Sequence, residues 1–138
     1  MSTSPLRLRE LLGRLVEAEI RFVLVGGLAV NAWGYMRGTQ DVDVVPDPDR
    51  ENLAKLDRLL RDPGHTELGQ VDVLQGLPQV PRYEQLAEQA KDVDLDGLVV
   101  RVCSLQHLLE MKRASDRPRD RDDLEALEAA QETDGDED

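Results

Sequence analysis

At 138 residues, the chain is long enough for one domain with a substantial core and leaves little room for a second. Its residues are 40% hydrophobic but only 3% aromatic, which indicates a globular protein whose core is mostly leucine and valine. The N-terminus does not resemble a signal peptide, no apolar run approaches the roughly 20 residues of a membrane span, and the net charge of −12 disfavours non-specific binding to nucleic acid or anionic membranes.

These features predict a cytoplasmic protein with no membrane partner. The single cysteine, Cys103, cannot form an internal disulfide, which suits a reducing compartment, and we interpret it as a core thiol rather than a nucleophile. Residues 132–138 are mostly acidic, a composition typical of a solvated, disordered end. The folded domain is therefore expected to span residues 1–131.

The first predicted elements are a helix from Ser4-Pro5 to about Ala18, with leucines at helical spacing, and a β-branched strand at Phe22–Val25. The strand stops at Gly26-Gly27, and Leu28–Trp33 then resumes as a helix, which is the pattern of strand, tight turn and helix. Glycines let the backbone approach a ligand closely, and the first N–H groups of a helix are unpaired. We therefore expect this turn to bind phosphate.

The next run, Asp41–Val45, alternates with period two and completes a βαβ-like start. Both of its carboxylates, Asp41 and Asp43, should lie on one face of the strand, with Val42 and Val44 on the other. Their Cα atoms are expected about 6.6 Å apart, close enough to share one Mg²⁺ ion or a pair of ions. Since Mg²⁺ usually takes one or two carboxylates plus phosphate oxygens, the turn and the carboxylates together indicate a nucleoside triphosphate.

Further along, a third helix is predicted from Asp47-Pro48 to about Asp62. A second period-two run, Val71–Leu74, places Asp72 on the face opposite its valines, where it could supply a third carboxylate. The remaining predicted elements are a helix at Tyr83–Ala90, a hairpin at Val93–Val102 that turns at Asp96-Gly97, a helix capped by Ser104, a basic linker at Arg117–Arg121 and a helix at Asp122–Ala130. The expected fold class is α/β (α+β), a mixed sheet flanked by helices.

Gly26-Gly27 after a strand, the segment RGTQDVD at residues 37–43 and Asp72 on a separate strand form a recognisable set. This set resembles the polymerase-β-like nucleotidyltransferase superfamily, in particular its small AbiEii-like and MNT-like members, which share an hGGxA…RxTxDhD pattern. Met111–Ala114 and Arg117–Leu124 also resemble that group's lysine helix and its RxxD-type motif. The resemblance spans about Leu11 to Leu127 and implies the minimal nucleotidyltransferase fold.

The resemblance implies that Asp41, Asp43 and Asp72 form the metal site. Asp72 would also help to activate an attacking hydroxyl, which displaces pyrophosphate from a nucleoside triphosphate. The chemistry is consistent, because two-metal phosphoryl transfer needs carboxylates to hold the ions.

The resemblance also assigns the groups that would bind the triphosphate. The backbone of Gly26 and Gly27 would cradle phosphates, Lys112 and Arg37 would complement their charge, and Thr39 could form a hydrogen bond nearby. Many relatives have a serine where this chain has Gly27, so a contact from that side chain is absent here and backbone donation remains.

Several of these residues also have plainer interpretations. Lys112 could be an exposed lysine on a helix whose other face is leucine-rich. The Arg117–Arg121 cluster could contact phosphate or an acceptor, or could simply solvate a linker. Four further residues are interpreted as structural: His65 and His107 at the surface or its boundary, and Trp33 and Tyr35 in the core or at its rim.

The sequence thus predicts a Mg²⁺-dependent nucleotidyltransferase that transfers a nucleoside monophosphate from an NTP to a hydroxyl. The acceptor would be a protein, an RNA such as tRNA, or a small molecule, with or without a role in a toxin–antitoxin pair, and the chain could form a homodimer. One alternative is a non-catalytic antitoxin or other binding module on the same fold. Another is a glycosyltransferase that uses Asp41-x-Asp43 to hold a nucleotide sugar, although 138 residues leave little room for that site.

Overall fold

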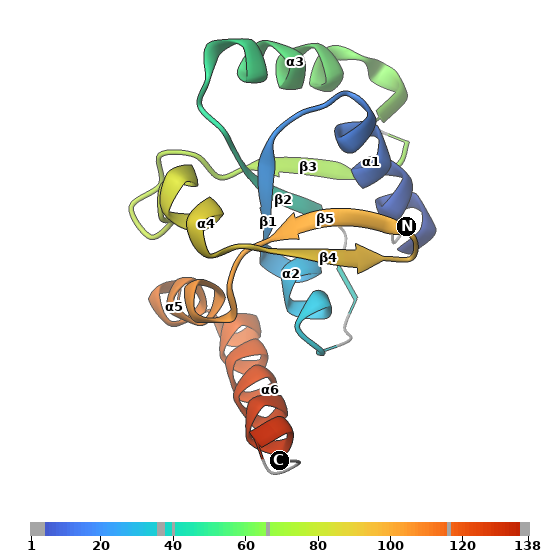
Figure 1. Cartoon of the computed structure of the whole chain (residues 1–138). Coiled ribbons are helices and arrows are strands. Elements are labelled where there is room, and N and C mark those ends of the chain that lie inside the picture. Colours follow the sequence, from blue (N-terminus) through green and yellow to red (C-terminus); the bar gives the residue numbers. More distant parts are fainter. Residues whose placement is uncertain (1–4, 36–37, 40, 66, 116, 136–138) are drawn as a thin grey trace.

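The computed structural model describes residues 5–35, 38–39, 41–65, 67–115 and 117–135. Within these residues, a five-stranded sheet is flanked by helices, and α5 and α6 extend from the end of the molecule opposite α3 (Figure 1). The elements in chain order are α1 (Pro5–Glu17), β1 (Phe22–Val25), α2 (Gly26–Ala32), β2 (Asp41–Pro46), α3 (Arg50–Arg61), the short 3-10 helix η1 (Pro63–His65), β3 (Gln70–Val73), α4 (Tyr83–Gln89), β4 (Lys91–Leu95), β5 (Leu98–Val102), α5 (Leu105–Ser115) and α6 (Pro118–Gly135).

The sheet has the strand order β3-β2-β1-β5-β4 and is mixed, which confirms the predicted fold class. β1 pairs antiparallel with β2 and parallel with β5, and β2 pairs parallel with β3. The predicted βαβ-like start is wrong in one respect, because β2 runs antiparallel to β1. Val25, at the end of β1, lies opposite Asp43, near the start of β2. β2 therefore begins at the same end of the sheet at which β1 ends.

The core is built mostly from leucine and valine, as the composition predicts. All four residues of β1 are buried, since this strand lies in the middle of the sheet. The helical leucines of α1 belong to the same cluster as the valines of β2. The main buried members are Leu8, Leu11, Leu15, Val23, Leu24, Val25, Val30, Val42, Val44, Leu86, Leu108 and Leu127.

Two helices begin earlier than the sequence predicts. α2 starts directly at Gly26, so the diglycine forms the first residues of the helix instead of a separate turn. α6 starts at Pro118 and continues to Gly135, so the predicted Arg117–Arg121 linker is mostly the first turn of this helix. Proline fits the first position of a helix, because its missing N–H would have no intrahelical acceptor there. Residues 136–138 of the predicted acidic tail lie outside the described residues.

Other local predictions agree with the structure. The β4–β5 hairpin turns at Asp96 and Gly97, both with positive φ. The Ser104 hydroxyl accepts a hydrogen bond from the His107 backbone N–H at 3.1 Å and so caps α5. Cys103 is fully buried, and burial raises the pKa of its thiol to about 12, as expected of a core residue.

No helix among the described residues is long and apolar enough to cross a membrane.

A buried asparagine ties α3 to the end of the sheet opposite the diglycine. The Asn52 side chain donates hydrogen bonds to the carbonyls of Arg21 and Asp47, each at 2.9 Å, and accepts one from the Arg21 N–H at 2.7 Å. Arg21 immediately precedes β1 and Asp47 immediately follows β2. Asn52 therefore fastens the open ends of the two antiparallel strands whose other ends carry the candidate site.

Replacing Asn52 with alanine should lower the free energy of unfolding by about 2 kcal/mol or more, because it leaves buried backbone groups without partners. Urea denaturation followed by circular dichroism measures this change. Asp57→Ala is the matched control on the same helix. It removes an exposed i,i+4 ion pair with Arg61 and should change stability by less than about 0.5 kcal/mol. Equal effects of the two substitutions would contradict the role of Asn52.

Candidate active site

Three aspartates from two neighbouring strands converge near one edge of the sheet. Asp41 and Asp43 belong to β2, and Asp72 belongs to β3. The parallel register places Asp43 directly beside Asp72. One carboxylate oxygen of each residue lies within 4.8 Å of those of the other two, and all three residues are half-buried. The structure therefore brings together the three carboxylates that the sequence singles out.

The alternation of β2 explains how one strand supplies two of the three carboxylates. Val42 and Val44 are 0% and 1% exposed and belong to the core, whereas Asp41 and Asp43 remain half-buried on the opposite face. Burial of the valines fixes which face of β2 carries the acids. A shift of one residue in strand register would turn both carboxylates into the core, so packing of the valines enforces the geometry of the site.

The first glycine of α2 lies against Asp43. Gly26 has a φ of +69°, and a Cβ at this position would overlap Asp43 Oδ2 and lie 2.9 Å from Asp43 Cβ. The glycine is therefore required by the backbone conformation and by the carboxylate of the adjacent strand. Gly26 is half-buried and Gly27 is buried, so of the two glycines Gly26 is the more accessible to a ligand.

The crowding of the carboxylates changes their acidity. Burial, a hydrogen bond to Asp72 and the charges of Asp72 and Asp41 together raise the pKa of Asp43 to about 7, against a smaller opposing effect of Lys112. Burial and the charge of Asp72 also raise the pKa of Asp41, whereas Arg119 lowers it. Gln70 Nε2 donates to Asp72 Oδ1 at 2.6 Å. Such a set of acids is relieved either by a proton or by a cation.

The donor set fits a hard divalent cation such as Mg²⁺, because all three side chains offer oxygen ligands within reach of one small volume. A cation there would hold Asp43 in its ionised form and could also accept phosphate oxygens from a substrate. The arrangement can therefore bind a metal–phosphate complex at the edge of the sheet, next to Gly26.

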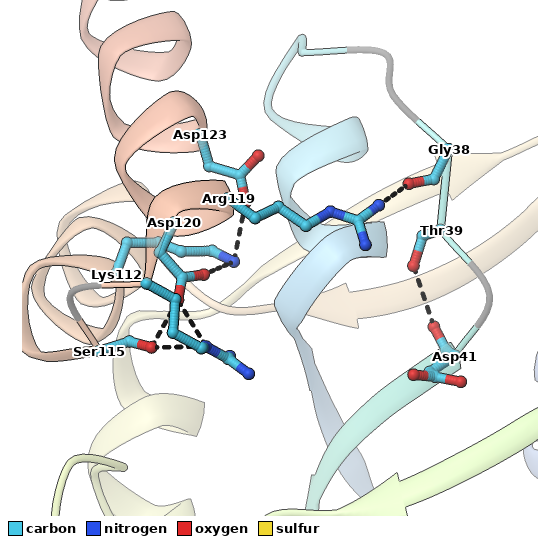
Figure 2. A network of polar contacts seen from close by, with 9 residues as sticks. Gly38, Thr39, Asp41, Lys112, Ser115, Arg119, Asp120 and Asp123 are labelled. Atoms are coloured by element: carbon cyan, nitrogen blue, oxygen red, sulfur yellow. Dashed lines mark hydrogen bonds and ion pairs between the residues drawn. The ribbon is translucent and has the colours of Figure 1, made fainter.

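A second cluster of charged residues joins α5 to α6, and its acidic and basic side chains pair with one another (Figure 2). Lys112 Nζ lies 2.9 Å from both Asp120 Oδ1 and Asp123 Oδ2. The three residues are 7%, 3% and 0% exposed, respectively. The Ser115 hydroxyl donates to Asp120 Oδ2 at 2.5 Å, and Arg117 Nε donates to the same oxygen at 2.9 Å. These bonds fix the first turn of α6 against the end of α5.

This cluster corrects one interpretation of the sequence. Lys112 is buried and paired with two carboxylates, so the alternative of a solvent-exposed lysine is wrong. Burial would raise the pKa of Asp120, but hydrogen bonds from Ser115, Lys112 and Arg117 lower it to about 2. Asp120 and Asp123 hold the buried lysine at the junction of α5 and α6. The charge of Lys112 also lowers the pKa of Asp43, against the larger effects that raise it.

Arg119 extends from this cluster toward the segment that leads into β2, and the sequence marks it only as one member of the Arg117–Arg121 cluster. Its Nη2 donates to the carbonyl of Gly38 at 2.5 Å, across 81 residues of sequence (Figure 2). Thr39, next in the chain, donates from Oγ1 to the Asp41 carbonyl at 3.4 Å. No local pattern predicts the contact of Arg119 with Gly38, because it depends on how α6 packs. The predicted phosphate ligand Arg37 lies outside the described residues.

Two residues interpreted as structural have defined surroundings. Trp33 Nε1 donates to the Cys103 carbonyl at 2.9 Å, and Lys91 Nζ lies 5.3 Å from the centre of the Trp33 ring, so this tryptophan is a half-buried part of the core rim. His107 is half-buried, with a buried Nδ1 that has no hydrogen-bond partner among the described residues. Neither lies in the aspartate cluster. The side chain of His65 lies outside the described residues.

Gly26→Ala should lower stability by about 2 kcal/mol or more, because the new methyl group would overlap Asp43 and the positive φ disfavours alanine. Gly13→Ala is the matched control. Gly13 lies within α1, and a methyl group added there would meet no atom within 4 Å, so alanine should stabilise the helix by about 0.5–1 kcal/mol. Thermal or urea unfolding measures both. The same sign for the two variants would contradict the close fit of Gly26 to Asp43.

The pH dependence of the metal-free protein should reflect Asp43. Its pKa of about 7 in the folded state exceeds the ordinary value of 3.8, so between these values the folded protein binds more protons than the unfolded chain. The contribution of this group to stability therefore falls as pH rises from about 4 to about 7. Melting temperatures in chelator over this range should show the fall. Asp43→Asn should flatten it, and Mg²⁺ or Mn²⁺ should restore stability near neutral pH. An unchanged pH profile in Asp43→Asn would refute the assignment.

Asp120 should show the opposite pH dependence to Asp43, because its pKa lies below the ordinary value. Its contribution to stability is present above about pH 4 and is lost as pH falls toward 2. The two acids therefore act in separate pH windows and in opposite directions.

Comparison with known proteins identifies the family. Among solved structures, the fold is similar to the lincosamide antibiotic adenylyltransferase LnuA in its lincomycin-bound form, with 16% identity, a TM-score of 0.69 and coverage of 94% of this chain and 99% of that one. It is also similar to an antigenic nucleotidyltransferase-like protein from Paracoccidioides brasiliensis, with 21% identity, a TM-score of 0.63 and coverage of 92% and 77%, respectively. At these identities the likeness shows the fold. No curated protein matches the chain in sequence.

Residues 6–137 match a family described as nucleotidyltransferase of unknown function (DUF6036). This match confirms the nucleotidyltransferase class predicted from the glycine and aspartate motifs, and it speaks against the glycosyltransferase alternative. Since it covers almost the whole chain, the protein belongs to the DUF6036 family of nucleotidyltransferases.

Proposed function

We propose that this protein transfers a nucleoside monophosphate from a metal-bound NTP to a hydroxyl group of an acceptor, with Mg²⁺ as the metal. The observation that carries the proposal is the convergence of Asp41, Asp43 and Asp72 at one edge of the sheet, within the fold of a nucleotidyltransferase family. These three side chains would hold the metal. When bound, Mg²⁺ would offset charge on the triphosphate and increase the acidity of the attacking hydroxyl.

The carboxylates of the two strands would have different roles. Asp41 and Asp43, on one strand, would face the triphosphate side of the metal site. Asp72, on the neighbouring strand and hydrogen-bonded to Gln70, would orient the acceptor hydroxyl and favour loss of its proton. The hydroxyl oxygen would form a new bond to the α-phosphorus, and pyrophosphate would leave with the electrons of the broken bond. The proton of the hydroxyl passes to solvent or to a carboxylate.

The remaining predicted residues would bind the nucleotide. The backbone at Gly26 and Gly27 and the hydroxyl of Thr39 would contact phosphate oxygens, as would Arg37. Lys112 would act through its positive charge, because its ammonium group is already held by two carboxylates. Its effect on the pKa of Asp43 supports this electrostatic role toward the metal site.

The acceptor is the least constrained part of the proposal. The lincomycin in the LnuA structure belongs to that protein, and 16% identity does not carry a substrate across. We therefore keep a protein, an RNA such as tRNA, and a small molecule as acceptor classes, together with a role in a toxin–antitoxin pair and a homodimeric state. Both NTPs and Mg²⁺ are abundant in the cytoplasm, the predicted location.

Incubation with each of four α-labelled NTPs, Mg²⁺ and candidate acceptors should give transfer of label. Asp41→Ala and Asp43→Ala should each lower kcat by about 100-fold or more, because either removes a ligand that stabilises charge in the transition state. Asp92→Asn is the control, since Asp92 is an exposed strand carboxylate paired with Arg101, and it should leave transfer unchanged.

The non-catalytic alternative has a distinct outcome. Metal-dependent NTP binding without transfer to any acceptor, together with stable co-purification of a partner protein, would favour a binding module on this fold. Absence of both transfer and metal-dependent NTP binding would reject the proposed function.

A further inference from the structure

An exposed arginine of α6 points from the buried charge cluster toward the strand that carries Asp41. Arg119 lies on the first turn of the helix, next to the buried Asp120. Figure 2 shows its side chain extending across to Gly38, on the segment that leads into β2. The guanidinium is therefore held near the metal-site edge, although it comes from the last helix of the chain.

The start of α6 is rigidly placed, which gives the Arg119 side chain a defined origin. Lys112 binds Asp120 and Asp123, and Ser115 and Arg117 also contact Asp120. Because Lys112 and the two aspartates are buried and paired, the backbone at Arg119 cannot shift without breaking several charge-assisted hydrogen bonds. The cluster thus fixes the direction in which the neighbouring arginine projects.

The guanidinium of Arg119 lies beside the segment that leads to Asp41. Its acceptor is the carbonyl of Gly38, and the next residue, Thr39, donates from its hydroxyl to the Asp41 carbonyl at 3.4 Å. The hydrogen-bond partner of Arg119 among the described residues is a neutral carbonyl, that of Gly38. A guanidinium has five N–H donors in a planar fork that matches phosphate oxygens, and this contact uses one nitrogen.

Two other cations in the described part of this region are already engaged by carboxylates. Lys112 is buried between Asp120 and Asp123, and Arg117 Nε is 2.9 Å from Asp120 Oδ2. Their charges are largely offset where they stand. Arg119 is exposed, and it differs from both because its contact is with an uncharged oxygen. It is therefore suited to receive an anion that enters with a metal at the aspartates.

We propose that Arg119 binds the phosphate groups of the metal-bound nucleotide and that its contact with Gly38 aims the guanidinium at them. The inference rests on the proposed function and adds a ligand-binding residue to that site. Arg119 would then connect the helical end of the chain to the triphosphate, and the buried Lys112–Asp120–Asp123 cluster would serve to position it. A simple clasp between α6 and the Gly38 segment is the competing explanation, and the two differ in which ligands lose affinity.

Isothermal titration calorimetry on the full chain separates the two explanations. The probes are Mn²⁺ alone, AMP, Mg²⁺–ATP and inorganic triphosphate with Mg²⁺. Arg119→Ala should raise the Kd for Mg²⁺–ATP and for Mg²⁺–triphosphate by about tenfold or more, and should leave the Kd for Mn²⁺ and AMP within about twofold. Arg119→Lys should retain part of the affinity, since it keeps the charge but loses the fork. Arg61→Ala, which removes an exposed arginine of α3, should change none of these values.

Each outcome decides a separate claim. Equal binding of Mg²⁺–ATP by the wild type and Arg119→Ala would overturn the role of Arg119 and leave the proposed function intact. A parallel loss of affinity for all four probes, with a lower melting temperature, would show that Arg119 is only a clasp. Failure of the wild type to bind any of the four Mg²⁺–NTPs would instead reject the proposed function, and the inference with it.

Discussion

The repulsion between three carboxylates held at one edge of the sheet is the constraint on which the site depends. Asp43 and Asp72 face each other because β2 and β3 are parallel and in register, and Asp41 follows from the period of β2. A folded protein keeps like charges this close only if packing elsewhere compensates. Burial of Val42 and Val44 and the network of Asn52 at the far end of the strands provide such packing. The repulsion that remains raises the pKa of Asp43, and a bound cation would offset it.

The two acidic clusters show how the same side chain can be used in opposite ways. The pKa of Asp43 is raised because burial and neighbouring carboxylates act together. The pKa of Asp120 is lowered although it is buried, because Lys112, Ser115 and Arg117 bind it. A cluster that supplies its own cation is structural, whereas one that lacks a cation within its own geometry is suited to take one from solution. This contrast, more than the number of aspartates, separates the candidate metal site from the α5–α6 junction.

Local periodicity predicts the parts of the structure that depend on near neighbours in the sequence. Short stretches of consecutive residues predict the strand at Phe22–Val25, the polar and apolar faces of β2, the Asp96-Gly97 hairpin and the Ser104 cap. The direction of β2, the burial of Lys112 and the contact of Arg119 with Gly38 do not, because they join segments that only the tertiary fold brings together. Pro118 does signal the start of α6, but the surrounding arginines and aspartates have the composition of a solvated linker, and this composition conceals the helix.

The role of the diglycine also differs from its usual interpretation. A glycine after a strand commonly indicates space for a ligand, yet at Gly26 the space is filled by the protein's own Asp43. The motif therefore reports how closely α2 approaches β2. This approach has a chemical consequence, because it brings the backbone of α2 beside a carboxylate that would hold the metal. A phosphate bound to that metal would then lie next to the diglycine backbone. Gly26 and Asp43 are thus in direct packing contact. For this reason the two motifs together indicate the site more specifically than either motif alone.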